Sequence, residues 1–188
     1  MSRKITINLS SNEIENLIKK IDNWSTMMNQ VAEKSINETA EYGLKEIQKN
    51  YNAFPYTPMS PIDFFKTGSK LEKTVGMRGP QALYTEFGTG TEGALDPHPQ
   101  KDEFGLNAYN SGKTIRPATK DVHEITMIPE GELYWTYEDP ETGRIRYTQG
   151  IPAGKQVYLA YKSTVKKAPK IFKDNLERVL KSWLYYHN

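Results

Sequence analysis

Apolar residues recur every three or four positions over long stretches near both ends of the chain, which is the spacing of amphipathic helices. Ser10 and Glu13 match a capping box, so the first helix is expected to begin there. The segment 22–25 (DNWS) predicts a break, after which a second, longer helix runs to about Asn50. In the C-terminal helical stretch, Pro169 either kinks one helix or lies in the first turn of a second. The apolar stripe of this stretch consists of Ile171, Phe172, Asn175, Leu176, Val179, Leu180, Trp183 and Leu184.

Shorter runs in the middle of the chain alternate between apolar and polar residues, as half-buried strands do. Residues 81–87 and 122–129 are therefore predicted to be strands, and residues 4–9 a strand or an extended arm. The strongest signal lies at 131–150, where two aromatic-rich runs flank the turn sequence DPETG and predict a β-hairpin. One face of this hairpin is expected to carry Leu133, Trp135 and Tyr137, with Ile145 and Tyr147 as candidate partners.

Loop composition dominates the chain from Gly88 to about Lys120, which is rich in Gly, Pro, Asp, Asn and Thr. A loop of this length is unusual in a compact domain and is usually functional or ordered by a partner. The order of elements predicts an α+β fold, in which long N-terminal helices and a C-terminal helical segment pack on an antiparallel β-sheet with a prominent hairpin. We expect a single domain over residues 1–188, with an N-terminal arm at 1–12 and an inserted loop region at 91–130.

Composition excludes several functional classes. The 188 residues include no cysteine, which removes disulfides, thiolate nucleophiles and cysteine-based zinc sites. The formal net charge of +2 gives no global signature of nucleic-acid binding. No apolar run approaches the ~20 residues that span a bilayer, and the N-terminus lacks the apolar core of a signal peptide, so neither membrane insertion nor export is expected. The hydrophobic fraction of 37% fits a small core and much partner-covered surface.

Gly88, Gly90 and Gly93 have the G-x-G-x-x-G spacing of a dinucleotide-binding loop. Such a loop works because it opens into a helix whose amides hold the pyrophosphate. Pro97 and Pro99 forbid a regular helix through the following segment, and no strand ending in an acidic residue follows at the required distance. We therefore expect no nucleotide and no other cofactor, and interpret the glycines as a strand end that releases the chain into the loop.

The polar loop also contains candidate residues for a metal site, and the chain can be searched for a catalytic nucleophile. Asp96, His98, Asp102 and Glu103 gather candidate ligands within one short segment, but the histidines are isolated and no paired-histidine motif occurs. A polar loop is the favoured interpretation, with no metal. No nucleophile-elbow motif is present, so the chain is not expected to be an enzyme. A metal-dependent hydrolase using Asp96, His98 and Asp102 is kept as a lesser alternative.

The C-terminal helical stretch is locally basic. Between Lys155 and Lys181 it carries eight Lys or Arg residues against two acidic ones. A solvated face or a complement to an acidic neighbour is the favoured interpretation, and nucleic-acid binding through these helices is the main alternative function. The residues that would face DNA or a lumen are Lys162, Lys166, Lys167 and Lys170.

Three short motifs occur in a telling order: SPIDFFKTGSKLEKTV at 60–75, ALYTEFGTG at 82–90 and GIPAGKQVYLAYKSTVKKAP at 150–169. This series resembles a tailed-bacteriophage family of neck, head–tail joining and tail-completion proteins, typified by the gene-ten product of phage HK-97. The chain departs from the family pattern by an insertion, Phe64-Phe65-Lys66, in the first motif and by Gly154–Val157 in the third. The matching residues are Thr67, Gly68, Leu71, Tyr84, Glu86, Phe87, Gly88, Thr89, Pro152 and Ala153.

The resemblance implies a structural virion protein without catalytic activity. It implies a homo-oligomeric ring, a hexamer or a dodecamer, at the neck or tail top, assembled in the host bacterial cytoplasm. Its partners would be other neck and tail proteins, such as a connector, a stopper or a tail terminator, with possible transient contact with passing DNA. Among the motif residues, Glu86 lies beside aromatic residues, so we expect it to find a cation or an amide, within the subunit or across an interface.

Overall fold

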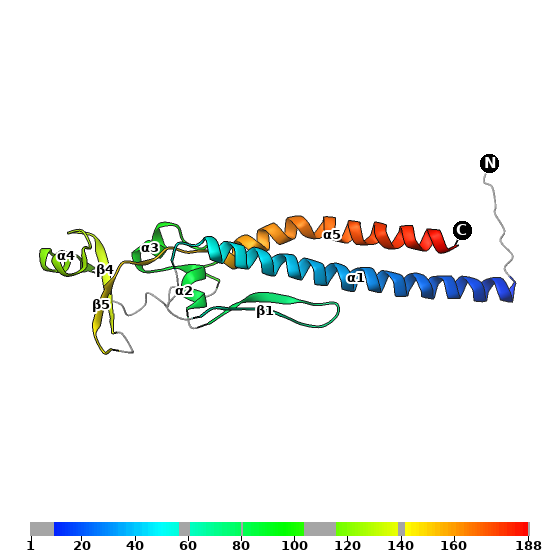
Figure 1. The fold of residues 1–188 in the computed structure, drawn as a ribbon, viewed down its shortest axis with the longest axis horizontal. Coiled ribbons are helices and arrows are strands. Elements are labelled where there is room, and N and C mark those ends of the chain that lie inside the picture. The colour runs from blue at the N-terminus through cyan, green and yellow to red at the C-terminus, as the bar shows by residue number, and fades with distance from the viewer. Residues whose placement is uncertain (1–9, 57–60, 80, 104–115, 139–141, 188) are drawn as a thin grey trace.

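Two long antiparallel helices dominate the computed structural model, which describes residues 10–56, 61–79, 81–103, 116–138 and 142–187. Helices α1 (Ser11–Ala53) and α5 (Gln156–His187) lie side by side as a helix pair and give the molecule an elongated shape (Figure 1). A β-hairpin lies along this helix pair, and further strands and short helices lie beyond one end of the pair. The α+β class is thus confirmed.

The predicted start of α1 is confirmed. The Ser10 hydroxyl accepts a hydrogen bond from the Glu13 amide at 3.3 Å, and the Glu13 carboxylate accepts one from the Ser10 amide at 2.7 Å, so both halves of the capping box form. The predicted break at 22–25 is wrong, because α1 continues through it as one helix. This segment contains neither Pro nor Gly, and Asp, Asn or Ser costs at most roughly 0.7 kcal/mol inside a helix.

Apolar and polar contacts alternate along the seam between α1 and α5. Val31 and Ile47 of α1 are almost fully buried. The buried Asn175 of α5 donates to Ser35 Oγ at 3.3 Å and to Glu38 Oε2 at 2.8 Å. At the other end of the pair, the Asn50 side chain donates to the Gln156 carbonyl at 3.1 Å. The hydrogen bonds of Asn175 and Asn50, near opposite ends of the pair, fix the antiparallel register of the two helices.

α5 is a single helix that continues through Pro169, as the first of the two predicted possibilities requires. Pro169 removes one backbone donor, but it lies on the exposed side of α5, where water can replace the lost bond. α1 extends past the end of α5, and every residue from 11 to 26 is exposed (Figure 1). Part of α1 therefore has no covering element among the described residues.

The hairpin beside the helix pair consists of β1 (Asp63–Thr67) and β2 (Thr74–Arg78), where the sequence predicted only a turn and a short strand or helical turn. The Phe64 ring makes an edge contact with Tyr51 of α1, with 5.3 Å between ring centres. Gly76 pairs with Phe65, and a Cβ at Gly76 would lie 3.0 Å from the Phe65 ring. The hairpin therefore packs its aromatic residues against α1 and against its own backbone.

Residues 81–87 are not the predicted strand but a short helix, α2 (Ala82–Phe87). Alternation over so few residues does not distinguish strand from helix, and Ala, Leu and Glu all favour helix. A second short helix, α3 (Gly90–Leu95), follows directly, so the predicted loop after Gly88 is partly ordered. α3 ends before Pro97, in keeping with the limit that this proline sets.

A three-stranded antiparallel sheet lies beyond the helix pair, in the order β3 (Arg116–Pro117), β4 (Leu133–Glu138) and β5 (Ile145–Thr148). The predicted hairpin is confirmed as β4 and β5, although residues 139–141 of its turn lie outside the described residues. The single predicted sheet is wrong, because β1 and β2 form a separate sheet. The arm predicted at 4–9 also lies outside the described residues.

The facing residues of the β4–β5 hairpin were predicted one position out of register. Tyr147 pairs with Thr136, and Ile145 pairs with Glu138. Directly opposed residues share a face, so Ile145 and Tyr147 lie on the other face from Leu133 and Trp135, while the side chain predicted at Tyr137 lies outside what the structure describes. The Tyr134 ring contacts the Tyr147 ring on that face, with 5.7 Å between ring centres.

Helix α4 (Lys120–Thr126) replaces the strand predicted at 122–129 and ends at Met127, whose φ is 65°. Together with α3 and β3 it gives regular structure to parts of the region 91–130, which was predicted to be an inserted loop and of which residues 104–115 lie outside the described residues. A small cluster of Ala118, Ile128 and Tyr134 packs under α4. This end of the molecule therefore has its own small apolar centre, separate from the helix pair.

Candidate functional site

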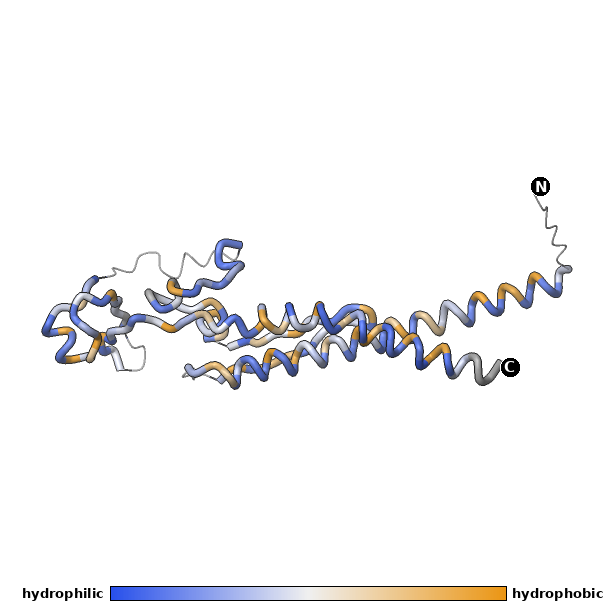
Figure 2. Tube along the Cα trace, turned by 90° about the horizontal axis from the view of Figure 1, so that it is seen from above, coloured by the Kyte–Doolittle hydropathy of each residue, from blue (hydrophilic) through white to orange (hydrophobic). Residues whose placement is uncertain are grey.

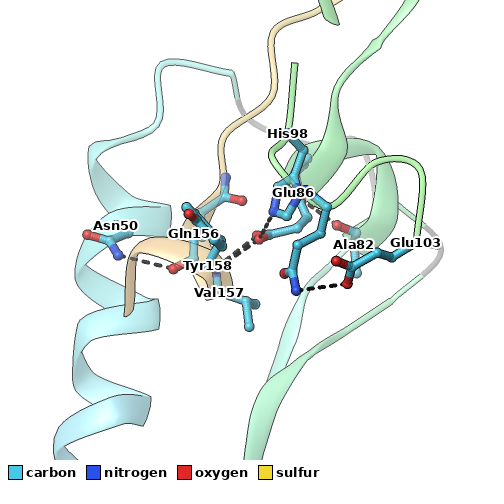
Figure 3. A network of polar contacts seen from close by, with 10 residues as sticks. Asn50, Ala82, Glu86, His98, Glu103, Gln156, Val157 and Tyr158 are labelled. Carbon is cyan, nitrogen blue, oxygen red and sulfur yellow. Dashed lines mark hydrogen bonds and ion pairs between the residues drawn. The ribbon is translucent and has the colours of Figure 1, made fainter. Parts of the chain in front are cut away.

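The second and third motifs meet at the N-terminus of α5, and Glu86 of α2 lies at the centre of this junction (Figure 3). Glu86 is only 5% exposed. Its carboxylate accepts hydrogen bonds from the Val157 amide at 2.8 Å and from the Tyr158 amide at 3.0 Å. These amides lack partners within α5 because they belong to its first turn, and the positive end of the helix dipole favours a carboxylate there. Glu86 therefore caps α5 from a different part of the chain.

His98 completes the junction from the segment after α3. Its Nε2 lies 3.1 Å from Glu86 Oε1, and its Nδ1 accepts a hydrogen bond from the Gln100 amide at 3.0 Å. The Nδ1 atom is thus an acceptor, so the neutral ring carries its hydrogen on Nε2. The Nε2–H group donates a hydrogen bond to the Glu86 carboxylate. The centre of the His98 ring also lies 4.1 Å from that of the Phe87 ring, at a tilt of 47°, and the His98 ring meets the Tyr158 ring edge-on at 5.2 Å.

Gln156, the first residue of α5, is fully buried beside Glu86. With its amide nitrogen turned toward α2, Gln156 donates to the Thr85 carbonyl at 3.2 Å and to Glu86 Oε2 at 3.1 Å. Each carboxylate oxygen of Glu86 then accepts two hydrogen bonds. A carboxylate with all its strong acceptor directions filled is an anchor rather than a free acid or base. The expected amide partners of Glu86 are therefore found within the subunit.

Backbone contacts join the same two motifs. The Gly154 amide donates to the Thr85 carbonyl at 2.8 Å, and the Lys155 amide donates to the Glu86 carbonyl at 2.9 Å. Thr89 forms an antiparallel bridge with Ile151, which belongs to the short strand β6 (Gly150–Ile151). Pro152 and Ala153 are half-buried at the junction, and Tyr84 is exposed on α2. Residues about sixty positions apart in the chain are thus held as one unit.

The glycines of the G-x-G-x-x-G stretch are explained by this close backbone packing. Gly88 and Gly90 have φ values of 74° and 62°, which disfavour residues with a Cβ. A Cβ at Gly88 would lie 2.6 Å from the Ala153 amide nitrogen, and a Cβ at Gly93 would lie 2.8 Å from the Gly88 carbonyl carbon. The glycines hold the 150–153 segment, so the space that a phosphate would need is filled by backbone.

The first motif is not part of the junction. Thr67 ends β1, Gly68 follows it, and Leu71 lies in the turn of the hairpin, where it is exposed. Gly68 has a φ of 114° and lies against the Glu72 backbone, so a glycine is needed for the turn geometry. The first motif therefore builds the β1–β2 hairpin beside the helix pair.

A cleft of about 390 Å³ opens beside the junction. Its walls are mainly apolar and come from β2, α2, the segment after α3 and the first turns of α5. Glu86 and His98 form one part of its wall. No local sequence signal marks His98 or Gln156 as a partner of Glu86, because each comes from a different element. The apolar lining residues include Met77, Leu83, Phe87, Tyr158 and Tyr161.

The residues weighed as metal ligands do not converge. Both ring nitrogens of His98 are engaged in hydrogen bonds, and Asp96 forms an ion pair with Lys155 at 2.6 Å. Within the described parts of the chain, no group of three His, Asp or Glu side chains is placed to hold a metal ion. The geometry gives the metal-dependent hydrolase alternative no support.

The lysines that were predicted to face DNA or a lumen lie along α5. Lys162, Lys166 and Lys170 are exposed, one helical turn apart. Lys167 is half-buried and lies over the Tyr42 ring at 6.0 Å. Three of the four lysines therefore form one exposed row, and the fourth faces α1.

Comparison of the chain with protein-family models, curated protein sequences and solved structures finds no match. No helix among the described residues is long and apolar enough to cross a membrane. The function must therefore be inferred from the residues of this chain.

Proposed function

We propose that this chain is a structural subunit of a ring in the neck or tail top of a tailed bacteriophage, where it joins the tail to the DNA-filled head. The observation that carries this proposal is the exposed apolar surface. Among the described residues, nineteen large hydrophobic side chains are exposed, whereas nine hydrophobic residues are buried. Five of these exposed side chains lie together on the first turns of α1, and contiguous exposed apolar patches usually mark protein interfaces.

The junction around Glu86 supports a structural role. Two of the three motifs that carry the resemblance to neck and tail-completion proteins fix the start of α5, where the Glu86 carboxylate accepts hydrogen bonds from four donors. Such an arrangement holds the helix pair in a fixed relation to the cleft and to β4–β5. The subunit would present rigid surfaces to its neighbours in a hexameric or dodecameric ring, and to a connector, a stopper or a tail terminator.

In vitro head–tail joining tests this proposal. The gene is deleted from the tailed phage that carries it, and lysates are examined by electron microscopy. We expect filled heads and free tails that fail to join, and we expect added purified protein to restore infectious particles. Intact, infectious particles made without the protein would refute the proposal. Mass spectrometry of purified wild-type particles should also detect the chain in multiple copies.

A second candidate function is nucleic-acid binding, which the lysine row favours. From 156 to 173, α5 carries five lysines and no acidic residue. Phosphate contacts of this kind would make binding fall steeply with salt, by about one power of ten in affinity per contact for a tenfold rise in salt. Retention of duplex DNA at low salt that is abolished by Lys162→Gln, Lys166→Gln and Lys170→Gln together would support it. No retention at low salt would eliminate it.

A further inference from the structure

The first turns of α1 carry an apolar stripe that no described residue covers. We define the α1 stripe as Ile14, Leu17, Ile18, Ile21 and Trp24, each at least 45% exposed. Seen from above in Figure 2, apolar positions recur along the part of α1 that projects past α5. At water-exposed positions without a partner, such side chains contribute nothing to the stability of the monomer.

The α1 stripe continues the face that α5 already covers. The spacing from Leu17 through Ile21 and Trp24 to Met28, Val31 and Ser35 alternates between four and three residues, as along a coiled-coil seam. Val31 and Ser35 are buried in the helix pair, Met28 is half-buried, and the positions before them are exposed. Within the subunit, the partner that packs on this face of α1 is the surface of another helix, α5. The uncovered part is therefore suited to a second surface of the same kind.

α5 carries such a second surface. Tyr161, Val165 and Phe172 recur at helical spacing and are 64%, 53% and 40% exposed. They form the α5 stripe, which lies on a different face from the buried Asn175 that contacts α1. Near its Tyr161 end the α5 stripe runs into the apolar cleft beside Glu86. The chain thus has two uncovered apolar stripes on two different elements.

We propose that the α1 stripe of one copy packs on the α5 stripe of a neighbouring copy of this chain. The proposal rests on the proposed oligomeric assembly and names the surfaces that build it. The stripes match in length: ten residues separate Ile14 from Trp24 and eleven separate Tyr161 from Phe172, which is about 15 Å and about 16 Å of helix. Both keep helical spacing, in steps of three and four residues from Ile14 to Trp24 and in steps of four and seven residues from Tyr161 to Phe172, so one helix surface can interlock with the other.

Charge favours this pairing over parallel pairing of two α1 stripes. The turns that carry the α1 stripe hold Glu13, Glu15 and Asp22 against Lys19 and Lys20, and both charges of the first two turns are negative, so two stripes in parallel would bring these acidic turns together. α5 flanks its own stripe with the exposed lysines Lys162 and Lys166 and has no acidic residue before Asp174. The acidic first turns of α1 therefore meet a basic helix face, which favours this partner and discriminates against parallel pairing of two α1 stripes.

Two different surfaces in contact make a heterologous interface, which closes into a ring when the rotation between neighbours is a whole fraction of a turn. A contact of three helical turns is smaller than the interface of a typical stable dimer. The contact is therefore expected to be weak between two free copies and to become stable when the ring closes, because each copy is then held at both stripes.

Disulfide trapping tests the contact, since the natural chain has no cysteine. Ile21→Cys and Val165→Cys lie near the middle of their stripes, so they approach each other whichever way the two helices run. The two full-length variants are mixed at high concentration under mild oxidation. We expect the mixed disulfide dimer to be the main covalent product, and the double variant to give a ladder of covalent oligomers. Lys19→Cys, which lies on the same turns of α1 away from the stripe, is the matched control and should give only background cross-linking with Val165→Cys.

Several outcomes would overturn the contact. If Ile21→Cys forms mainly dimers with itself, the α1 stripe pairs with its own kind. If the mixed product does not exceed that of Lys19→Cys, the α1 stripe binds some other protein. Circular dichroism establishes that each variant has the natural helix content. If the cross-link does not form although the protein restores head–tail joining, this contact alone is refuted. If the cross-link forms but infectious particles assemble without the protein, the neck function alone is refuted.

Discussion

The two parts of α1 share one helix and one apolar spacing, yet their surroundings differ completely. From Met27 onward the seam is buried against α5, and buried polar groups such as Asn175 and Ser35 are paired across it. Before Met27 the same spacing continues, and every residue is in water. A hydrophobic pattern therefore specifies a face that must be covered without specifying which chain covers it.

The largest effect is expected at the inner end of the helix pair, where Glu86 caps α5. Glu86→Ala would leave the amides of Val157 and Tyr158 and the Nε2–H of His98 buried without their acceptor. We expect the free energy of unfolding, measured with urea, to fall by about 4 kcal/mol, because several donors lose their partner at once. Glu86→Gln keeps the shape and one acceptor oxygen, and should lose about half as much. A loss below about 1 kcal/mol for Glu86→Ala would contradict the capping role.

A matched pair of substitutions compares the two parts of α1 directly. Ile47 is 1% exposed in the covered part, and Ile21 is 58% exposed in the uncovered part. Ile47→Ala is expected to cost about 3 kcal/mol of monomer unfolding free energy, because it leaves a cavity. Ile21→Ala should change it by less than about 0.5 kcal/mol, as at most exposed positions. Equal losses, measured at low protein concentration, would mean that the outer part of α1 is covered within the subunit.

Sequence reasoning predicted what depends on neighbours along the chain. The capping box at Ser10, the two amphipathic stretches and the β4–β5 hairpin follow from local spacing, and the structure has all three. It failed where distant contacts decide. The segment 81–87 is a helix, and its Glu86 finds its partners at the first turn of α5, about seventy residues away. No local pattern records that distance.

The candidate site was predictable only in part, for the same physical reason. The resemblance selected Glu86, Gly88 and Thr89, which all lie at the junction, together with Thr67 and Leu71, which do not. His98 was considered as a metal ligand, whereas its nitrogens hold the junction instead. A histidine in a polar loop gives the same sequence signal in both cases. Only the fold shows which group its ring nitrogens meet.

Backbone packing at the inner end gives the next prediction. Gly90 has a φ of 62°, and a Cβ there would lie 2.5 Å from Trp135 Nε1 as well as against the Gln149 backbone. Gly90→Ala should lower the unfolding free energy by about 2 kcal/mol, since strain and a steric clash add. Gly131 also has a positive φ, of 83°, but a Cβ there would meet nothing within 4 Å. Gly131→Ala should therefore lower the unfolding free energy by only about 1 kcal/mol, which is the cost of a positive φ without a steric clash. If the two losses are equal, the close approach at Gly90 is not formed in solution.

The smallest effect is expected at the outer end, where Glu13 and Ser10 close the first turn of α1. Hydrogen bonds from the Ser10 amide and hydroxyl hold the pKa of Glu13 below its usual value. Because this pKa is lowered in the folded state, the capping box contributes above the usual pKa of a glutamate and is lost as pH falls through the lowered value. Ser10→Ala removes the hydroxyl, so an NMR titration should show the pKa of Glu13 rising toward its usual value, with more fraying of residues 11–14. Ser10→Thr keeps a capping hydroxyl and should keep the pKa low. The global unfolding free energy should stay unchanged in both variants, because this end of α1 is uncovered in the monomer. A clear loss of global stability in Ser10→Ala would show instead that the outer turns of α1 are part of the cooperative fold of a single copy.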